Sequence, residues 1–386
     1  MNREWPLTKL SQLILEERQQ VGTYDGNGLP VLGVTNIGGV TRTGIEASAD
    51  KSKYLRVRPN RLVYNPYRIN VGSIGLVSSD QEGICSPAYV VFAPTETIDS
   101  RFLFFFLKST RGNSQINFFG NRGTVRSALR FDDLCKIEIP LPCVGEQRRV
   151  VDRIQSLTQL VACVRALRNA STAESLTLHA KLMSRVFDKY RSQSVPIGSK
   201  FRVTTGGTPS RSNPAYWRGD VNWVSSGEVS FRRINQTAEK ITRLGVQESN
   251  AKVYPPSTVL LAMIGQGKTR GQCAILDCSA ATNQNVAAIH VHETDHIPEY
   301  VYWWLYSNYQ LSRASEVGTA QPALSGDRVK KMLIPLPSPT EQLRVVREMQ
   351  SLEVLITNLK QLQTDTMAEI EALLPSILDR AFSGAL

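Results

Sequence analysis

The chain has 386 residues, of which 41% are hydrophobic, so it is long enough for two or more domains with cores of their own. No apolar run approaches the ~20 residues of a membrane-spanning helix, and the first residues lack the basic segment and apolar run of a signal peptide. The six cysteines form no CxxC pair, which argues against a disulfide framework and a zinc knuckle and favours a cytoplasmic protein with no membrane partner.

The net charge of +11 favours a polyanionic partner such as nucleic acid, although ordinary surface charge would give the same balance. Most of the surplus lies in residues 1–195, which have 26 Lys and Arg against 17 Asp and Glu, whereas residues 196–386 have 19 against 17. Arginine outnumbers lysine in both halves, and its planar guanidinium group suits paired contacts with phosphate and guanine better than an ammonium group does.

The first part of the chain, residues 1–143, is expected to form a mixed α/β module. Residues 61–64 and 89–92 are apolar runs rich in β-forming residues, and residues 100–110 have aromatic side chains at helical spacing. We expect these aromatic side chains, Phe102, Phe105 and Phe106, to belong to the core rather than to stack on bases. Gly, Asn, Arg and Ser fill the connections, which is where recognition residues usually lie.

A long helix is predicted after this module, at residues 144–190. Its apolar residues recur at alternating spacings of four and three, as in the seam of a coiled coil: Val150, Ile154, Leu157, Val161 and Val164. Ser171 and Ser175 fall on the same seam, so the middle of the helix is more polar than its start.

The second half repeats this plan, with a module at residues 191–338 and a helix at residues 339–386. Residues 258–264 and 286–291 are predicted strands, and residues 298–311 are a predicted helix with Tyr300, Trp303 and Trp304. Pro375 is expected to kink or interrupt the final helix. The seam residues of that helix are Val345, Met349, Leu352, Ile356 and Leu359, followed by Ile370, Leu373 and Ile377.

An internal repeat relates the two halves. Ile-Pro-Leu-Pro occurs at residues 139–142 and 334–337, and Glu-Gln follows at 146–147 and 341–342, which gives an offset of 195 residues. The same offset relates Gln-Ser-Leu at 155–157 and 350–352, but farther upstream the register slips. The similar rear segments indicate one shared structural task, whereas the divergent modules indicate two versions of a recognition task.

The order of the segments predicts how the two helices pair. The first helix leads away from the first module and the second helix begins at the second module, so a helix pair must be antiparallel. The halves are then related by a pseudo-two-fold axis, with the chain termini near each other. A helix of about 40 residues is roughly 60 Å long, which would place the modules on DNA sites one to two turns apart at ~34 Å per turn.

Two segments are similar to enzyme motifs but lack the neighbouring residues that these motifs need. Gly265–Thr269 ends like a phosphate-binding loop, but the first glycine of that pattern would fall on Ala262 and a strand, not a helix, is predicted to follow. Asn65-Pro66-Tyr67 is similar to a methyltransferase tetrapeptide but lacks its second proline and a glycine-rich cofactor loop. The Lys, Thr and Arg residues that follow Gly267 favour a loop that touches DNA over nucleotide binding.

The histidines give no better case for chemistry. His290 and His292 would share one face of a strand, with Glu293, Asp295 and His296 nearby, but no third metal ligand is specified. No histidine lies near a convincing nucleophile, so the sequence predicts neither a metal site nor a catalytic residue.

The chain resembles the specificity subunit of type I restriction–modification systems along nearly its whole length. The residues that carry the likeness in the second half are 206–210, 216–217, 223–228, 265–271 and 283–285. Those in the first half are 62–65 and 83–91, which look like a different subtype of the same target-recognition domain. The Ile-Pro-Leu-Pro segments with their downstream Glu-Gln resemble the start of the family's two repeated helical regions.

This resemblance implies two α/β (α+β) target-recognition domains joined by two long antiparallel coiled-coil helices. Each domain would read one half of a split double-stranded DNA target. The helices would set the gap and dock two methyltransferase subunits, through which restriction/translocase subunits join. S-adenosylmethionine would bind the methyltransferase partners, and this chain would have no cofactor and no catalytic activity of its own.

Phosphate contacts would set the register on DNA, while loop side chains would read base edges. The candidate DNA contacts of the first half are Arg42, Lys51, Lys53, Arg68, Arg122 and Arg126. Those of the second half are Thr208, Ser210, Arg211, Lys268, Thr269, Arg270 and Gln321. The candidate partner contacts are Glu146, Gln147, Glu341 and Gln342, which would otherwise only cap their helices. Two alternatives stay open: a self-contained nucleic-acid-modifying enzyme, and a coiled-coil adaptor that does not read DNA.

Overall fold

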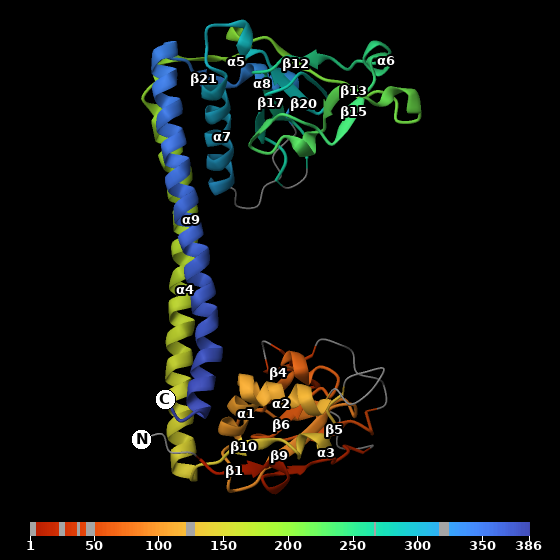
Figure 1. Ribbon diagram of the computed structural model, residues 1–386, viewed down its shortest axis with the longest axis vertical. Helices are drawn as coiled ribbons and strands as arrows, with labels where there is room; N and C mark the ends of the chain where they lie inside the picture. Colours follow the sequence, from red (N-terminus) through yellow and green to blue (C-terminus); the bar gives the residue numbers. More distant parts are fainter. Residues whose placement is uncertain are drawn as a thin grey trace. The chain divides into compact units, whose positions relative to one another are not determined.

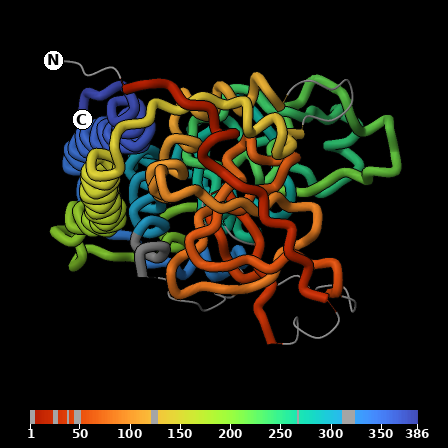
Figure 2. The backbone as a smooth tube through the Cα atoms, turned by 90° about the horizontal axis from the view of Figure 1, so that it is seen from below, coloured from red at the N-terminus to blue at the C-terminus, as the bar shows by residue number. Residues whose placement is uncertain are grey.

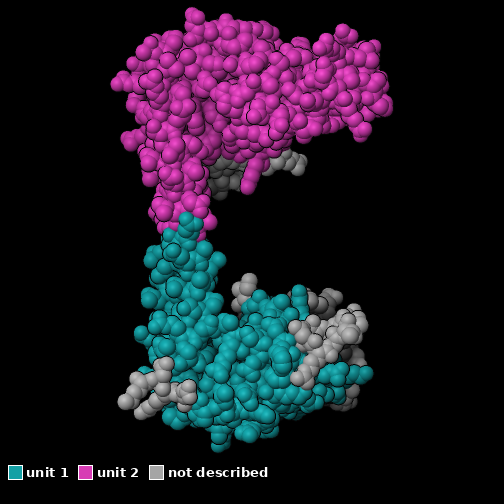
Figure 3. Space-filling model, in the orientation of Figure 1, with its two compact units in different colours: residues 1–167, 365–386 teal, residues 168–364 magenta. Residues whose placement is uncertain are grey.

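A computed structural model of the chain describes residues 5–22, 28–36, 39–43, 51–120, 128–265, 268–315 and 324–386, with the side chains of 311–315 excepted. The chain forms two compact units (Figure 3). The first unit comprises residues 1–167 and 365–386, and the second comprises residues 168–364. Each unit contains one module together with the parts of the two long helices that pack against it. This division does not separate helices from modules, so the four segments expected from the sequence stay a prediction.

The first unit is built on an antiparallel sheet with the order β2-β9-β6-β7 (Figure 1). Its described strands are β1 (Leu7–Lys9), β2 (Ile14–Glu16), β3 (Leu32–Thr35), β4 (Gly39–Arg42), β5 (Leu55–Val57), β6 (Leu62–Tyr64), β7 (Ile74–Leu76), β8 (Gly83–Cys85), β9 (Val90–Pro94) and β10 (Glu138–Pro140). Its helices are α1 (Ser100–Lys108), α2 (Thr110–Gly120), α3 (Phe131–Leu134) and the start of α4 (Val144–Asp188). The strands β3 and β4, β5 and β8, and β1 and β10 form further pairs.

The second unit contains a sheet with the order β12-β20-β17-β18-β14 and a smaller sheet with the order β15-β13-β19-β16. Its described strands are β11 (Ser194–Pro196), β12 (Val203–Thr205), β13 (Trp217–Val224), β14 (Arg232–Ile234), β15 (Glu239–Ile241), β16 (Val253–Tyr254), β17 (Val259–Ala262), β18 (Cys273–Leu276), β19 (Ala280–Thr282), β20 (Val286–Ile289) and β21 (Leu333–Pro335). Its helices are α5 (Ile197–Lys200), α6 (Arg243–Gln247), α7 (Pro298–Ser315), α8 (Gly326–Lys331) and most of α9 (Pro339–Phe382).

The two units share one strand arrangement. β9 pairs with β2 and β6, and β6 pairs with β7, just as β20 pairs with β12 and β17, and β17 pairs with β18. The pair β1 and β10 corresponds to the pair β11 and β21 in the same way. The second unit adds β14 and the smaller sheet, so the internal repeat extends through the modules, and the divergence lies in the strands added to the common sheet.

Apolar side chains explain why the predicted elements form. The expected strands at 61–64, 89–92, 258–264 and 286–291 are confirmed as β6, β9, β17 and β20, and the expected aromatic helices are confirmed as α1 and α7. Asp99 begins α1 by accepting hydrogen bonds from the backbone N–H groups of Arg101 and Phe102. Phe102, Phe106 and Tyr300 are fully buried, which confirms that these aromatics form core rather than base-stacking surfaces.

The long helices pack against each other in antiparallel fashion in both units. In the first unit, Ile154 of early α4 shares a core with Leu378 and Phe382 of late α9, and the two segments lie side by side in both views (Figures 1 and 2). In the second unit, Phe187 of late α4 shares a core with Met349 of early α9. The predicted antiparallel pair is therefore confirmed.

Two expectations for the helices need correction. Val164, Leu359 and Leu373 are expected in the seam but are 40%, 43% and 43% exposed, because the apolar packing is concentrated where each helix meets a module. Of the kink or interruption expected at Pro375, the interruption does not occur, since α9 runs through this residue to Phe382, whereas the kink stays a prediction. The burial of Ile370, Leu378 and Phe382 on both sides of the proline offsets the loss of one backbone donor.

Among the described helices, none combines the length and the apolar character needed to cross a membrane. The first and the last of the described residues, Trp5 and Leu386, both pack against the hydrophobic cluster of the first unit. This agrees with the expected proximity of the termini.

One buried titratable group predicts a pH dependence of stability. His179 of α4 is 4% exposed and its Nε2 atom lies 3.0 Å from Met183 Sδ, and burial, aided by the charge of Lys360, lowers the pKa of His179 to about 4. In the unfolded chain the pKa of histidine is about 6.5. The unfolded state then binds more protons than the folded state between pH about 6.5 and about 4, so the free energy of unfolding should fall as the pH falls through this window.

Urea unfolding at a series of pH values checks this expectation. Leucine cannot be protonated, so His179→Leu should reduce the slope of the free energy of unfolding against pH between pH about 6.5 and about 4. Above pH about 7, where histidine is neutral in both states, the variant should leave the pH dependence of stability unchanged. Identical slopes for the wild type and the variant would contradict the assignment.

Candidate nucleic-acid interface

The described candidate DNA contacts of the first unit lie on exposed connections. Arg42 ends β4, Lys51 and Lys53 precede β5, and Arg68 lies between β6 and β7. Arg42, Lys53 and Arg68 are exposed, and within the described ranges these cations have no ion pair with a carboxylate. Such cations are free to contact phosphate oxygens. Arg122 and Arg126 lie outside the described residues.

The candidates of the second unit differ from one another in their surroundings. Arg211 donates to both oxygens of Glu239, which raises the pKa of Arg211, and its guanidinium carbon lies 3.8 Å from the ring centroid of Trp217. Thr208 donates to Gln284 Oε1, and Ser210 bonds with Ser212. The side chains of Thr208, Ser210 and Arg211 therefore already bond to other residues of the chain. Lys268, by contrast, is exposed in the loop after β17. Gln321 lies outside the described residues.

The loop that resembles a phosphate-binding loop lacks the helix that such loops need. Gly265 and Lys268–Gly271 lie between β17 and β18, and β18 begins at Cys273, as the sequence predicts. Without a helix N-terminus after the loop, no set of backbone N–H groups converges on a phosphate. Asn65-Pro66-Tyr67 forms a turn in which Asn65 Oδ1 accepts a hydrogen bond from the Tyr67 backbone, which is a structural use of the motif.

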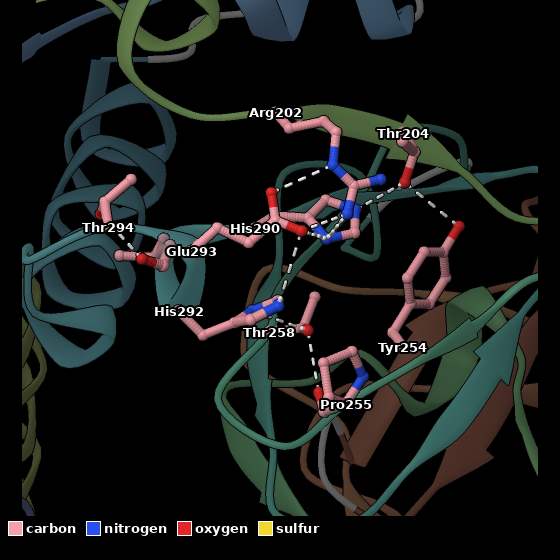
Figure 4. Close-up of polar contacts among 10 residues, drawn as sticks. Arg202, Thr204, Tyr254, Pro255, Thr258, His290, His292, Glu293 and Thr294 are labelled. Carbon is pink, nitrogen blue, oxygen red and sulfur yellow. Dashed lines mark hydrogen bonds and ion pairs between the residues drawn. The ribbon is translucent and has the colours of Figure 1, made fainter.

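The histidine cluster lies at the end of β20 (Figure 4). His290 follows β20, and His292 and Glu293 belong to a 3₁₀ turn at Val291–Glu293, so the expectation that both histidines lie on one strand is wrong. The ring of His290 lies against Arg202 and Thr204, whose polar atoms each lie 2.9 Å from a ring nitrogen. The potential ligand atoms of His290, His292 and Glu293 lie within 4.8 Å of one another.

A cationic side chain, Arg202, already contacts His290 and Glu293 of this cluster. Arg202 donates to both carboxylate oxygens of Glu293, which lowers the pKa of Glu293, and burial together with Arg202 lowers the pKa of His290. The guanidinium group fills the position that a metal ion would need, and the positive charge beside the cluster opposes binding of a second cation. The arrangement fits a structural ion pair that fastens β12 to the end of β20.

The Gln of each Glu-Gln pair has the same role at the start of its helix. Gln147 is fully buried: its Oε1 accepts from the Asp99 backbone at 2.8 Å, and its Nε2 donates to the carbonyl oxygens of Thr97 and Pro142. Gln342 is also fully buried, with Oε1 2.9 Å from the Ile297 backbone nitrogen and Nε2 2.8 Å from the Pro337 carbonyl oxygen. Each amide thus ties the start of a long helix to the segment that precedes an aromatic helix, α1 or α7.

The neighbouring glutamates remain accessible. Glu146 pairs with Arg149, and Glu341 accepts from Tyr190 and lies 3.8 Å from Arg344, and both carboxylates are partly exposed. Of the four residues expected to contact a partner subunit, the two glutamines are buried and bond within the chain, and the two glutamates are partly exposed. Whether any of them touches a partner stays a prediction.

The sequence did not indicate two kinds of side chain at the candidate loops: those that lie in a loop beside a predicted contact and those that hydrogen-bond to a loop from elsewhere in the module. Tyr67 and Asn70 are exposed beside Arg68, Gln284 is the partner of Thr208, and Lys108 and Tyr309 bond to loop carbonyl oxygens. A signal for the loops exists in the sequence, because a glycine precedes the second hairpin strand at Gly72 and at Gly271.

Comparison with known proteins identifies the family. The model of the type I restriction modification DNA specificity domain matches residues 14–170 and 191–369, so the chain belongs to this family. The specificity subunit of the type I restriction enzyme MjaIX from Methanocaldococcus jannaschii is 28% identical over 163 residues, which cover 41% of this chain and 37% of that protein. The EcoR124I/EcoR124II specificity subunit from Escherichia coli is 22% identical over 236 residues, which cover 58% of this chain and 57% of that protein. The matched stretches therefore span less than two thirds of these relatives.

Solved structures share the fold along the whole chain. The HsdS subunit from Thermoanaerobacter tengcongensis has a TM-score of 0.66 at 22% identity, and covers 100% of this chain and 98% of that one. A chain from a study of complex assembly and conformational transition of the type I R-M system has a TM-score of 0.73 at 21% identity, with 100% and 99% covered. At these identities the likeness shows the fold, including two modules and two long helices.

Replacing a buried glutamine should destabilise the junction that it holds. Gln147→Leu removes a donor and an acceptor from a fully buried site and leaves the Asp99 N–H and two carbonyl oxygens without their partner, so we expect a loss of roughly 2–4 kcal/mol in the free energy of unfolding. Gln350→Leu, at an exposed position of α9, is the control and should change stability by less than about 0.5 kcal/mol. Equal effects of the two variants in urea unfolding would refute this role.

Proposed function

We propose that this chain is the DNA-reading subunit of a type I restriction–modification complex and has no catalytic activity of its own. The observation that carries the proposal is the duplication of one sheet arrangement in two modules of a chain that belongs to the DNA specificity family. Each module would read one half of a bipartite double-stranded target. The exposed cations of the first unit and the overall charge of +11 support DNA as the partner.

The helices supply a repeated docking surface for the methyltransferase subunits in this proposal. Leu160 and Leu167 of α4 are 61% and 66% exposed, and they lie one heptad apart on one face of the helix. The offset of 195 residues relates them to Leu355 and Leu362 of α9, which are 64% and 62% exposed. Two equivalent apolar surfaces favour two copies of the same partner.

The resemblance to specificity subunits implies the division of labour in the complex. S-adenosylmethionine would bind the methyltransferase subunits, and restriction/translocase subunits would join through them. Glu146 and Glu341, which are partly exposed at the starts of the two helices, would add polar contacts with the same partners. No residue of this chain is assigned a catalytic step.

Reconstitution tests the proposed function. The purified chain with S-adenosylmethionine should not methylate DNA, whereas the chain co-purified with the methyltransferase subunit of its host should methylate a split motif with a fixed gap. Methylation-sensitive sequencing of the host genome supplies that motif. Methylation by the chain alone, or a continuous rather than split motif, would overturn the proposal.

Exchange of a module tests whether the two halves read separately. Replacement of residues 191–338 by the corresponding module of another family member should change one half of the methylated motif and preserve the other half. The reciprocal replacement of residues 1–143 is the matched control and should change the other half. A change of both halves by one replacement would contradict the model of two readers.

Charge in the exposed leucine surface should weaken partner docking. The double variant Leu160→Glu and Leu167→Glu removes apolar area at positions whose side chains contribute little to the chain's own core, so the fold should persist while capture of the methyltransferase subunit falls. Pull-down of the purified methyltransferase subunit measures the effect, with Gln350→Glu as a surface control on α9. Undiminished capture of both methyltransferase copies would argue against this surface.

A further inference from the structure

Two hairpin loops occupy the same place in the two modules. In the loop between β6 and β7 the Asn65 backbone donates to the Ser73 carbonyl oxygen at 3.1 Å, and in the loop between β17 and β18 the Ala262 backbone donates to the Gln272 carbonyl oxygen at 2.9 Å. The glycines before Ser73 and Gln272, Gly72 and Gly271, have φ angles of 91° and 85°. The loops are therefore equivalent, although their sequences share no longer motif.

A side chain from the following helix holds each loop. Lys108, the last residue of α1, donates from Nζ to the Gly72 carbonyl oxygen at 2.6 Å and to the Asn36 carbonyl oxygen at 3.3 Å. Tyr309 of α7 donates from its hydroxyl to the Lys268 carbonyl oxygen at 2.8 Å. Because α1 follows β9 and α7 follows β20, the two contacts come from corresponding helices.

The inner side of the first loop is packed against the module. Ile69 is buried in the core of the first unit, the Leu129 backbone donates to the Pro66 carbonyl oxygen, and Ser73 Oγ donates to the Val34 carbonyl oxygen. A Cβ atom at Gly72 would lie 2.2 Å from Asn36 Oδ1, so the Asn36 side chain packs directly against the Gly72 backbone. The loop is thus fixed before any ligand binds, which lowers the entropy cost of recognition.

The outer side of the first loop presents groups that suit a DNA groove. Tyr67 and Val71 are 58% and 54% exposed, and Arg68 and Asn70 are exposed between them. Among the described residues Arg68 has no ion-pair partner, so its guanidinium is available for guanine or phosphate, and an asparagine amide matches the major-groove edge of adenine. In the second loop Lys268 is exposed and Thr269 is half-buried, and both can contact bases or phosphates.

We propose that residues 65–73 and the described residues 268–272 of the loop between β17 and β18 are the corresponding base-reading elements of the two modules, and that Lys108 and Tyr309 are positioning residues that fix them. Arg68 and Asn70 would read one half of the target, and Lys268 and Thr269 the other half. The inference rests on the proposed function, because it assumes that each module binds duplex DNA. It adds which loop reads the bases and which side chains hold that loop in place.

Discrimination assays on the assembled complex test the loops. The probes are a duplex with the split motif methylated by the wild-type complex and two duplexes in which one base pair of either half is changed. Arg68→Ala with Asn70→Ala should reduce the discrimination against changes in one half by roughly 5- to 150-fold, which corresponds to the loss of a paired base contact. Discrimination in the other half should stay the same, and Lys268→Ala with Thr269→Ala should show the reverse pattern.

The positioning role has its own variants. Lys108→Met and Tyr309→Phe keep the exposed loop side chains but remove the donors, and each should reduce discrimination only in the half read by its own loop. Lys108→Arg, which keeps a donor, should restore it. Arg58→Ala changes an exposed arginine between β5 and β6, away from the loop, and should leave discrimination in both halves unchanged.

The outcomes separate the two proposals. If the wild-type complex methylates no split motif, the proposed function fails, and the loop assignment fails with it. If the wild type reads a split motif but both loop variants discriminate like the wild type, only the loop assignment is overturned. Equal loss in both halves from a variant of one loop would also overturn it, because a reader of one half cannot affect the other.

Discussion

The structure depends on how each long helix is fastened to its module, and a buried glutamine amide makes that connection. Gln147 and Gln342 each lie in a site closed to solvent and bond to backbone groups on both sides of the helix start. An amide that misses these bonds would leave buried polar groups without partners, so the geometry of the junction is tightly constrained. The same residue type in both halves explains why the Glu-Gln pairs keep one register.

Most of the architecture could be predicted from the sequence because it follows from periodic patterns. The aromatic helices and the long helices have apolar residues at spacings of three and four, the central strands are short apolar runs, and the offset of 195 residues reveals the duplication. The smaller sheet of the second module, formed by β13, β15, β16 and β19, could not be predicted, because its pairing depends on contacts such as Trp223 with Ile241 and Ala281 that lie far apart in the sequence.

The candidate site was harder to predict because exposed side chains leave no periodic signal. Charge alone selected Arg68, but it also selected Arg211, whose guanidinium is held by Glu239 and Trp217. The glutamines at the helix starts are expected either to contact a partner or only to cap their helices, and their amides bond within the chain. In each case a partner distant in sequence decides what the side chain is free to do, and only the fold shows that partner.

Hydroxyl-radical footprinting of the assembled complex on a duplex with its split motif tests the central claim most directly, because it maps where the chain and its partners shield the DNA backbone. Complexes containing the wild-type chain should protect two half-sites, and a chain with its second module exchanged should keep the footprint of the first half-site on the original duplex and lose that of the second. Loss of both footprints on this exchange, with the complex still assembled, would contradict separate reading by two modules.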